Sequence, residues 1–351
     1  NVFARGATDD KGQMLTPVKS VQAWLAAAGS LPVQVKLLIE GEEEVGSEHL
    51  ERFLESNAQR LACDCVVISD TSQFAAGVPA ITYGLRGIAY FELKLFGPKQ
   101  DLHSGVFGGA VANPANALAT MLAGLINAEG RITIPGFYDH VLPLAPEERA
   151  EFAALPFDEP GFAGQLGVEA LTGETGFTTL ERRWARPTFD VNGLTSGYQG
   201  EGAKTVLPAR ASAKLSFRLV PRQDPLAVAA ALRRRLAELL PVGIRMELVE
   251  HHGAPGVVMP LESPYLQAAA TAIESGFGRR PVLIREGGSI PIVTAFAAVL
   301  DADVLLLGWG QNDDNPHSPN EKFSLDDFHR GIRASAALWR ELAKTPVKSR
   351  P

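Results

Sequence analysis

Cysteine is nearly absent from this sequence of 351 residues, which contains only Cys63 and Cys65. The two stand at positions i and i+2 of a predicted strand, so their side chains point to opposite faces and cannot form a disulfide with each other. This scarcity favours a reducing compartment. Long apolar runs and the pattern of a signal peptide are missing as well. The sequence therefore predicts a cytoplasmic protein that does not span a membrane.

Positive charge is also scarce, since the net charge is −7 at neutral pH. Nucleic acid is therefore not an expected partner. Hydrophobic residues make up 46% of the chain and charged residues 21%, which is an ordinary balance for a folded protein. A chain of this length is not expected to form a single core, and its length predicts two domains.

The chain is organised around three consecutive carboxylates, Glu42, Glu43 and Glu44, which follow an apolar stretch over residues 33–39. The apolar stretch predicts a buried strand, and residues 48–54 predict an amphipathic helix. The acids then lie in the turn at the carboxyl end of a strand, where open α/β sheets bind ligands. A divalent cation would relieve their repulsion by binding one acid and leaving another free as a base. A solvated acidic turn before a helix is the alternative interpretation.

Helices and apolar strands alternate through the first part of the chain. We expect a helix over residues 13–28, the strand over 33–39, a helix ending near residue 61 and a strand over 65–68. This alternation predicts a doubly wound parallel or mixed sheet with helices on both faces. Asp70 follows the last of these strands, and Asp9 follows what we interpret as a further strand end. We therefore expect these acids to meet those of the acidic turn.

The middle of the chain has a different pattern. Strands and helices are expected in a β-α-β-β-α-β order, at 87–95, 115–126, 189–194, 211–220, 225–240 and 244–250, with a loop-rich segment over 129–186. That order is typical of a ferredoxin-like sandwich. The first pattern then returns, with helices at 265–275 and 325–343 and strands at 281–284 and 304–307. We predict a domain over 87–254 inserted into an α/β domain formed by 1–86 and 255–351.

Further candidate residues lie outside the acidic turn. His103 stands in a glycine-rich turn, where a lone histidine more often has a structural role. His317 stands in a polar turn, either as a metal ligand or as an ordinary turn residue. Gly288 and Ser289 belong to a turn that resembles an anion-binding backbone nest. Arg218 lies in a mostly apolar strand, where it either pairs with an acid or grips a substrate carboxylate.

Together these segments resemble the two-metal peptidases of metallopeptidase family 20, clan MH, and within it the branch of the cytosolic nonspecific dipeptidases and carnosinases. The family resemblance is carried by residues 5–12 (RGATDDKG), 43–46 (EEVG), 69–70 (SD) and 316–321 (PHSPNE). The resemblance to the branch is carried by residues 83–88 (YGLRGI), 101–106 (DLHSGV), 204–208 (KTVLP), 216–221 (SFRLVP) and 285–291 (REGGSIP). The motifs follow the family's order and extend over nearly the whole chain.

The resemblance implies a fold and a metal site. The fold is a doubly wound, phosphorylase/hydrolase-like catalytic domain with an inserted lid and dimerisation domain. Asp9 bridges two divalent metal ions, Glu44 and His317 complete one metal site, and Asp70 holds the other ion. Oxygen and nitrogen ligands without a thiolate suit zinc or manganese, and also cobalt. The family commonly has a cis peptide bond after this aspartate, here between Asp9 and Asp10.

The resemblance also implies the reaction, which is hydrolysis of dipeptides. Glu43 is the general base, which takes a proton from the attacking water and later passes it to the leaving amine. His103 acts across the interface of a homodimer and stabilises the oxyanion. The residues that hold the backbone and the C-terminal carboxylate of the substrate are Thr205, Arg218, Gly288 and Ser289.

One family feature is missing from the 351 residues. The family carries an upstream His-x-Asp motif whose histidine binds the second metal, and no histidine precedes Asp9 in this chain. We therefore expect the sequence to be an N-terminally incomplete version of the enzyme. Two alternatives stay open. One is an N-acyl amino acid deacylase of the acetylornithine or succinyl-diaminopimelate type, and the other is a non-catalytic dimeric binding relative that lacks one metal ligand.

Overall fold

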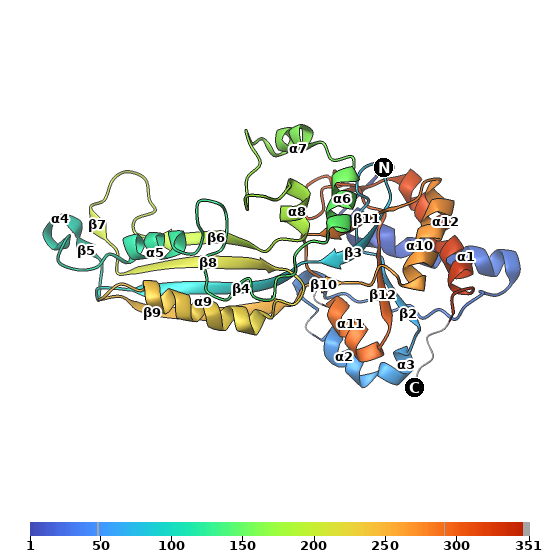
Figure 1. Ribbon diagram of the computed structural model, residues 1–351, viewed down its shortest axis with the longest axis horizontal. Coiled ribbons are helices and arrows are strands. Elements are labelled where there is room, and N and C mark those ends of the chain that lie inside the picture. Colours follow the sequence, from blue (N-terminus) through green and yellow to red (C-terminus); the bar gives the residue numbers. More distant parts are fainter. Residues whose placement is uncertain (48, 291, 347–351) are drawn as a thin grey trace. The chain divides into compact units, whose positions relative to one another are not determined.

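The computed structural model describes residues 1–47, 49–290 and 292–346. The chain divides into two units, whose elements are labelled in Figure 1. Unit 1 consists of Asn1–Gly84, Val258–Glu286 and Ile290–Pro351, and unit 2 consists of Leu85–Val257 and Gly287–Ser289. Glu48, in the helix predicted after the acidic turn, and Pro291, in the 285–291 motif, lie outside the described residues.

Unit 1 is built on a mixed sheet of five short strands. They are β2 (Cys65–Ile68), β3 (Ala80–Leu85), β10 (Val257–Val258), β11 (Val282–Glu286) and β12 (Asp303–Leu307). Strand β12 pairs in parallel with β2 and antiparallel with β3, and β3 also pairs with β10 and β11. Val304, Leu305 and Leu306 of β12 are buried in the core. The predicted mixed sheet is therefore confirmed.

Helices cover both faces of this sheet (Figure 1). One group contains α1 (Gly12–Ala28), α10 (Pro264–Phe277) and α12 (Leu325–Leu342), of which α10 packs against β12. The other contains α2 (Leu50–Ser56), α3 (Ala58–Leu61) and α11 (Ile292–Leu300), of which α11 packs against β12. Gly276 lets α10 approach α12 closely, because a Cβ atom added there would lie only 2.7 Å from Cβ of Ala334.

The strand predicted over residues 33–39 is wrong. This segment has no regular structure and pairs with no strand in the part of the chain that is described. Val33 and Val35 are half-buried, but the apolar side chains at its end are exposed, with 52% of Leu37 and 62% of Ile39 accessible to solvent. A strand needs a partner for its backbone N–H and C=O groups, and an apolar composition does not supply one. The acidic turn therefore follows an unpaired segment instead of a buried strand.

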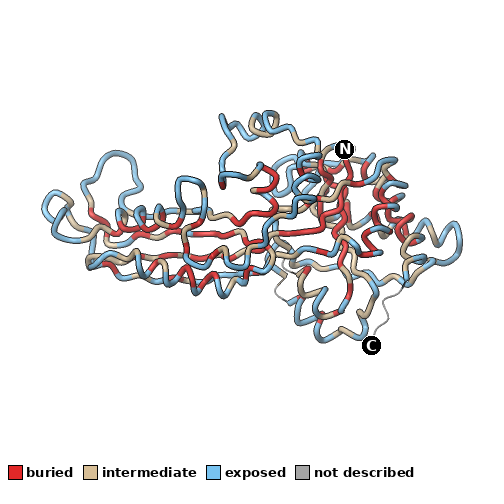
Figure 2. Tube along the Cα trace, viewed as in Figure 1, coloured by how far each residue is buried: buried red, intermediate tan, exposed pale blue. Residues whose placement is uncertain are grey.

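Unit 2 is built on a four-stranded antiparallel sheet in the order β6-β8-β4-β9. Its main elements are β4 (Gly87–Phe96), α5 (Pro114–Ala123), β6 (Thr188–Ser196), β8 (Arg210–Leu219), α9 (Pro225–Leu239) and β9 (Arg245–Ala254). Their order along the chain is the predicted β-α-β-β-α-β order. Alternate side chains of β4, such as Phe91 and Leu93, share one core with Met121 of α5 and Leu232 of α9. Buried positions run along these strands in Figure 2.

Short strands and helices lie between the main elements of unit 2 along the chain. Strand β5 (Leu102–His103) pairs with β7 (Val206–Leu207) and leads into α4 (Ser104–Phe107). The segment predicted as loop-rich contains three short helices, α6 (Pro146–Ala154), α7 (Glu159–Leu166) and α8 (Thr179–Trp184). Local capping starts two of them, because Asp158 caps α7 and Thr178 forms a capping box with Glu181 in α8. Helices this short leave little periodic signal in the sequence.

Two turns and a small sheet complete unit 1. Strand β1 (Val2–Phe3) pairs antiparallel with β13 (Lys322–Phe323). The helical turn η1 (Ala7–Lys11) precedes α1, and the 3-10 turn η2 (Glu43–Val45) carries two of the three acids of the acidic turn. Among the helices of the described ranges, none combines the length and the apolar character needed to cross a bilayer.

Candidate functional site

Three segments of unit 1 bring a histidine and two carboxylates together. Asp9 lies in η1, Glu44 lies in η2, and His317 lies in the polar loop after β12. The Nε2 atom of His317 lies 2.8 Å from Oδ2 of Asp9 and 2.9 Å from Oε2 of Glu44. One possible ligand atom of each residue lies within 4.8 Å of the other two. This spacing suits three ligands around one metal ion.

Further carboxylates border this cluster. Burial, followed by the charges of Asp9 and Glu43, raises the pKa of Asp70 to about 7. Burial, followed by the charges of Asp70 and Asp9, raises the pKa of Asp10 to about 9. Burial and the charges of Asp9 and Glu44 likewise raise the pKa of Glu43. The acids expected to meet at this edge of unit 1 are therefore close enough to repel one another.

The residues of this cluster fit a divalent cation. The Oδ1 atom of Asp10 is buried and has no hydrogen-bond partner among the described residues. A cation beside these acids would offset the repulsion that raises their pKa values. Carboxylate oxygens and an imidazole nitrogen, without a thiolate, suit zinc, manganese or cobalt. The peptide bond between Asp9 and Asp10 is cis, as the family resemblance predicts.

We expect the metal-free protein to lose stability as the pH rises. An aspartate with a raised pKa holds its proton more tightly in the folded state than in the unfolded state, where the ordinary value is 3.8. The stability it contributes is complete below about pH 4, and it is lost as the pH passes about 7 for Asp70 and about 9 for Asp10. Thermal unfolding in the presence of a chelator, followed from about pH 5 to about pH 9, measures this loss.

Asp10→Asn provides the control for this pH dependence, because it removes the acid with the highest of these pKa values. The variant should unfold at a higher temperature than the wild type near pH 9 and show a flatter dependence on pH. Zinc or manganese should also flatten the wild-type curve. A metal-free wild type with the same unfolding temperature across this range would show that the acids do not repel one another.

Arg5 and Glu321 are candidate residues to which the sequence analysis assigned no role. The guanidinium of Arg5 contacts Glu44 and donates a hydrogen bond to the backbone carbonyl of Asp9 at 3.0 Å. It also lies 3.4 Å from Oε2 of Glu321. Arg5 is the first residue of the 5–12 motif and Glu321 is the last residue of the 316–321 motif. These positions were the only signal for them in the sequence. A motif shows that a residue recurs in a pattern, but not which atoms it contacts.

In unit 2 the structure groups His103 with Thr205. The Oγ1 atom of Thr205 lies 3.4 Å from Nε2 of His103, and the backbone N–H of Gly105 donates to Nδ1 of His103 at 3.1 Å. Because Nδ1 is an acceptor, the proton of the neutral ring is assigned to Nε2. His103 therefore presents an N–H donor from an exposed turn.

Arg218 and Ser289 form a second group in unit 2. Nη1 of Arg218 donates to Oγ of Ser289 at 3.0 Å, and the same hydroxyl donates to the backbone carbonyl of Arg86 at 2.6 Å. The single hydroxyl proton of Ser289 is thus already used within the protein. Gly288 is exposed, and a Cβ atom added there would meet no atom within 4 Å. Burial lowers the pKa of Arg218, but an arginine stays charged at neutral pH.

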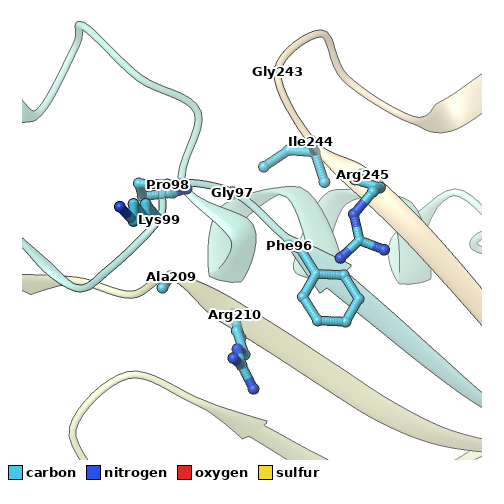
Figure 3. A pocket seen from close by; sticks show the side chains of 9 residues that line it. All are labelled: Phe96, Gly97, Pro98, Lys99, Ala209, Arg210, Gly243, Ile244 and Arg245. Atoms are coloured by element: carbon cyan, nitrogen blue, oxygen red, sulfur yellow. The ribbon is translucent and has the colours of Figure 1, made fainter.

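A hollow of about 480 Å³ lies at one end of the sheet of unit 2 (Figure 3). Its lining includes Phe96, Lys99, Arg210 and Arg245 and none of the predicted site residues. The guanidinium of Arg245 lies over the Phe96 ring at 4.0 Å, whereas Lys99 points away from that ring in Figure 3. The guanidinium of Arg210 lies 5.9 Å from the centre of the same ring, so the two arginines are engaged with Phe96 and Lys99 does not join them.

Sequence comparison connects these observations to a family. Residues 1–341 match the model described as peptidase family M20/M25/M40. The chain belongs to this family. The Cys-Gly metallodipeptidase dug1 of Schizosaccharomyces pombe is 35% identical over 347 residues, which cover 97% of this chain and 73% of that protein. The human Beta-Ala-His dipeptidase is also 35% identical, and the match covers 98% of this chain and 69% of that protein. The family resemblance drawn from the motifs is confirmed.

Solved structures of M20 peptidases have the same fold. The di-peptidase Dug1p of Saccharomyces cerevisiae matches with a TM-score of 0.84 at 32% identity, over 98% of this chain and 73% of that chain. The M20 family metallo-carboxypeptidase Sso-CP2 of Sulfolobus solfataricus matches with a TM-score of 0.88 at 33% identity, over 97% of this chain and 78% of that chain.

Proposed function

We propose that this protein is a metal-dependent dipeptidase that hydrolyses the amide bond of dipeptides or short peptides with a free C-terminal carboxylate. The observation that carries the proposal is the cluster of Asp9, Glu44 and His317, whose ligand atoms lie within 4.8 Å of one another in a member of a peptidase family. The names of two relatives, a Cys-Gly metallodipeptidase and a Beta-Ala-His dipeptidase, support the substrate class.

In this proposal the enzyme uses two divalent metal ions as cofactors. The ions are zinc or manganese, with cobalt as the alternative. Asp9, Glu44 and His317 would hold one ion, and Asp9 and Asp70 would hold the second. When bound, the ions polarise the scissile carbonyl and lower the pKa of the attacking water. The histidine that the family supplies to the second ion belongs to the His-x-Asp motif, which is not among these 351 residues.

Glu43 is the general base of the proposal. Burial and neighbouring acids raise its pKa, so its carboxylate accepts a proton more readily than an ordinary glutamate does. It takes a proton from the attacking water and passes it to the nitrogen of the leaving amine. Glu43 and Glu44 are neighbours in the same short turn, and among the contacts of the described residues Arg5 pairs with Glu44 and not with Glu43. This difference suits one acid to proton transfer and the other to ligation.

Unit 2 serves in the proposal as a ferredoxin-like lid and dimerisation domain inserted into a cytoplasmic catalytic domain. His103 acts across the interface of a homodimer and donates the N–H of Nε2 to the developing oxyanion. Thr205 lies 3.4 Å from this nitrogen, and in this proposal its hydroxyl binds the substrate backbone while the N–H of His103 is left for the oxyanion. An N–H donor aimed at the place where negative charge develops stabilises the transition state more than the ground state.

Arg218 binds the C-terminal carboxylate of the substrate in this proposal. Ser289 takes up one N–H of the guanidinium, and the described residues make no other hydrogen bond to it, so its other N–H groups can bind a carboxylate. Because the hydroxyl proton of Ser289 is given to the carbonyl of Arg86, Ser289 orients Arg218 and does not itself donate to the substrate. Gly288 leaves open space for the substrate beside this pair.

Arg218→Ala should raise KM for Leu-Gly about 10–100-fold, since a hydrogen bond to a charged group contributes about 1.5–3 kcal/mol. Its effect on kcat should be smaller, because the carboxylate is bound in the ground state as well. For the C-terminal amide of Leu-Gly the variant and the wild type should have similar KM values. Arg210→Ala, at the other end of β8, is the matched control. If KM rises equally for Leu-Gly and for its C-terminal amide, Arg218 does not bind the carboxylate.

The substrate class is tested by a panel of dipeptides measured beside N-acetylornithine and N-succinyl-diaminopimelate. We expect turnover of the dipeptides and little of the N-acyl amino acids. Turnover of the N-acyl amino acids alone would show a deacylase with the same site. Metal binding without turnover of any of these substrates, both by this chain and by a chain extended upstream with the family's His-x-Asp motif, would instead support the non-catalytic binding relative.

A further inference from the structure

Glu321 is buried beneath the segment that carries Asp9. Only 2% of its surface is exposed. Its Oε2 atom accepts the backbone N–H of Gly6 at 2.7 Å, and its Oε1 atom accepts the backbone N–H groups of Thr8 and Asp9, each at 3.0 Å. Three backbone donors of one short segment therefore converge on a single carboxylate, as they do around an anion bound in a backbone nest.

The pairing of β1 with β13 explains why Glu321 reaches this segment. Phe3 lies opposite Lys322 in the register, and the backbone N–H of Ala4 donates to the carbonyl of Glu321 at 3.1 Å. Glu321 is thereby fixed beside the chain just before it turns into η1. A side chain of this length and charge can then reach the N–H groups of residues 6, 8 and 9 at once.

The hydrogen bond from the backbone of Asp9 to Glu321 also links two of the proposed metal ligands, Asp9 and His317. The backbone of Asp9 is held on Glu321, while the side chain of Asp9 lies 2.8 Å from Nε2 of His317. His317 is in turn four residues before Glu321 in the same loop. Arg5 adds a third connection, since it contacts Glu321, the carbonyl of Asp9 and the carboxylate of Glu44.

We propose that Glu321 is a positioning residue of the metal centre, which fixes the backbone of Asp9 so that its carboxylate meets His317 and Glu44 at one point. The role rests on the metal site of the proposed function. Glu321 itself binds no metal in this proposal, because its two oxygens are occupied by backbone N–H groups and Arg5. In Glu321→Gln, one acceptor oxygen is replaced by an NH₂ group that faces backbone donors, so the segment shifts.

The test is the dissociation constant of zinc for the metal-stripped protein, measured by competition with a chromophoric chelator. Glu321→Gln should bind zinc about 10–100-fold more weakly than the wild type, which is the usual effect of a group that orients a ligand. The electronic spectrum of the cobalt form should change as well. Asp327→Asn is the matched control, because Asp327 is also buried in unit 1 but accepts from Gln311 and Arg330.

The control separates positioning from general stability. Both variants should unfold at lower temperature without metal, but only Glu321→Gln should lose zinc affinity. If Glu321→Gln does not fold, Glu321→Asp, which keeps the charge and withdraws the oxygens by one methylene, takes its place. Zinc affinity equal to that of the wild type in the folded variant overturns this role and leaves the dipeptidase proposal intact. A wild type extended upstream by the family's His-x-Asp motif that binds zinc but cleaves no dipeptide overturns the dipeptidase and not this role. A wild type without zinc affinity, both as this chain and in the extended form, overturns both.

Discussion

Glu43→Ala should lower kcat for dipeptide hydrolysis by about 10²–10⁴-fold, which is the usual contribution of a general base. The carboxylate of Glu43 has a raised pKa because it is partly buried and faces Asp9 and Glu44. It is therefore the acid of this turn best suited to accept a proton. Since Glu43 is not a member of the cluster with ligand spacing, the metal content of the variant should equal that of the wild type. Turnover and metal content are measured on the same preparation.

Glu42→Ala is the matched control for this change. Glu42 is the adjacent acid in the sequence, but its carboxylate lies 2.9 Å from Nδ1 of His49, and this partner lowers its pKa. The variant should keep both turnover and metal. If Glu43→Ala instead loses its metal while Glu44→Ala keeps it, the base and the ligand have been assigned the wrong way round.

His317→Ala should remove the metal from the site that it shares with Asp9 and Glu44. One of three ligands is lost, and the two remaining carboxylates repel each other without the imidazole that now lies between them. Zinc affinity should fall by more than the roughly 100-fold that the loss of an orienting group causes. Dipeptide turnover should fall in proportion to the metal occupancy. Both are measured after equilibration with a fixed concentration of free zinc.

His49→Ala tests whether any loss is specific to His317. His49 is an exposed histidine of unit 1 that pairs with Glu42. Its removal should change neither zinc affinity nor turnover. A His317→Ala protein that binds zinc as tightly as the wild type would show that the cluster is an ion-pair network and not a metal centre.

Most of the main helices and strands could be predicted from the sequence, because they have a clear local signal, but strand β3 and helix α11 were not predicted. Strand β2 and helix α12, for example, have an apolar run and an amphipathic period that need no knowledge of the partner. The segment over residues 33–39 has an equally strong apolar signal but forms no strand, because pairing depends on a neighbour that local sequence does not specify.

The grouping of the candidate ligands could be predicted from the sequence, but the contacts that hold them in place could not. The motifs named Asp9, Glu44 and His317, and the structure places their ligand atoms together. The contacts of Glu321 with three backbone N–H groups left no trace in the sequence, since a backbone donor has no residue type. The same limit applies to Ser289, because only the structure shows that its hydroxyl proton is given to a carbonyl.

Metal-dependent hydrolysis of Leu-Gly, with metal content measured on the same samples, is the most direct test of a metal-dependent dipeptidase. The protein is stripped with a chelator and reconstituted with zinc or manganese, both as this chain and as a chain extended upstream by a segment with the family's His-x-Asp motif. We predict that turnover disappears with the metal and returns with it, at least in the extended form. Hydrolysis that survives complete removal of metal, or metal-loaded protein that cleaves no dipeptide in either form, would contradict the account.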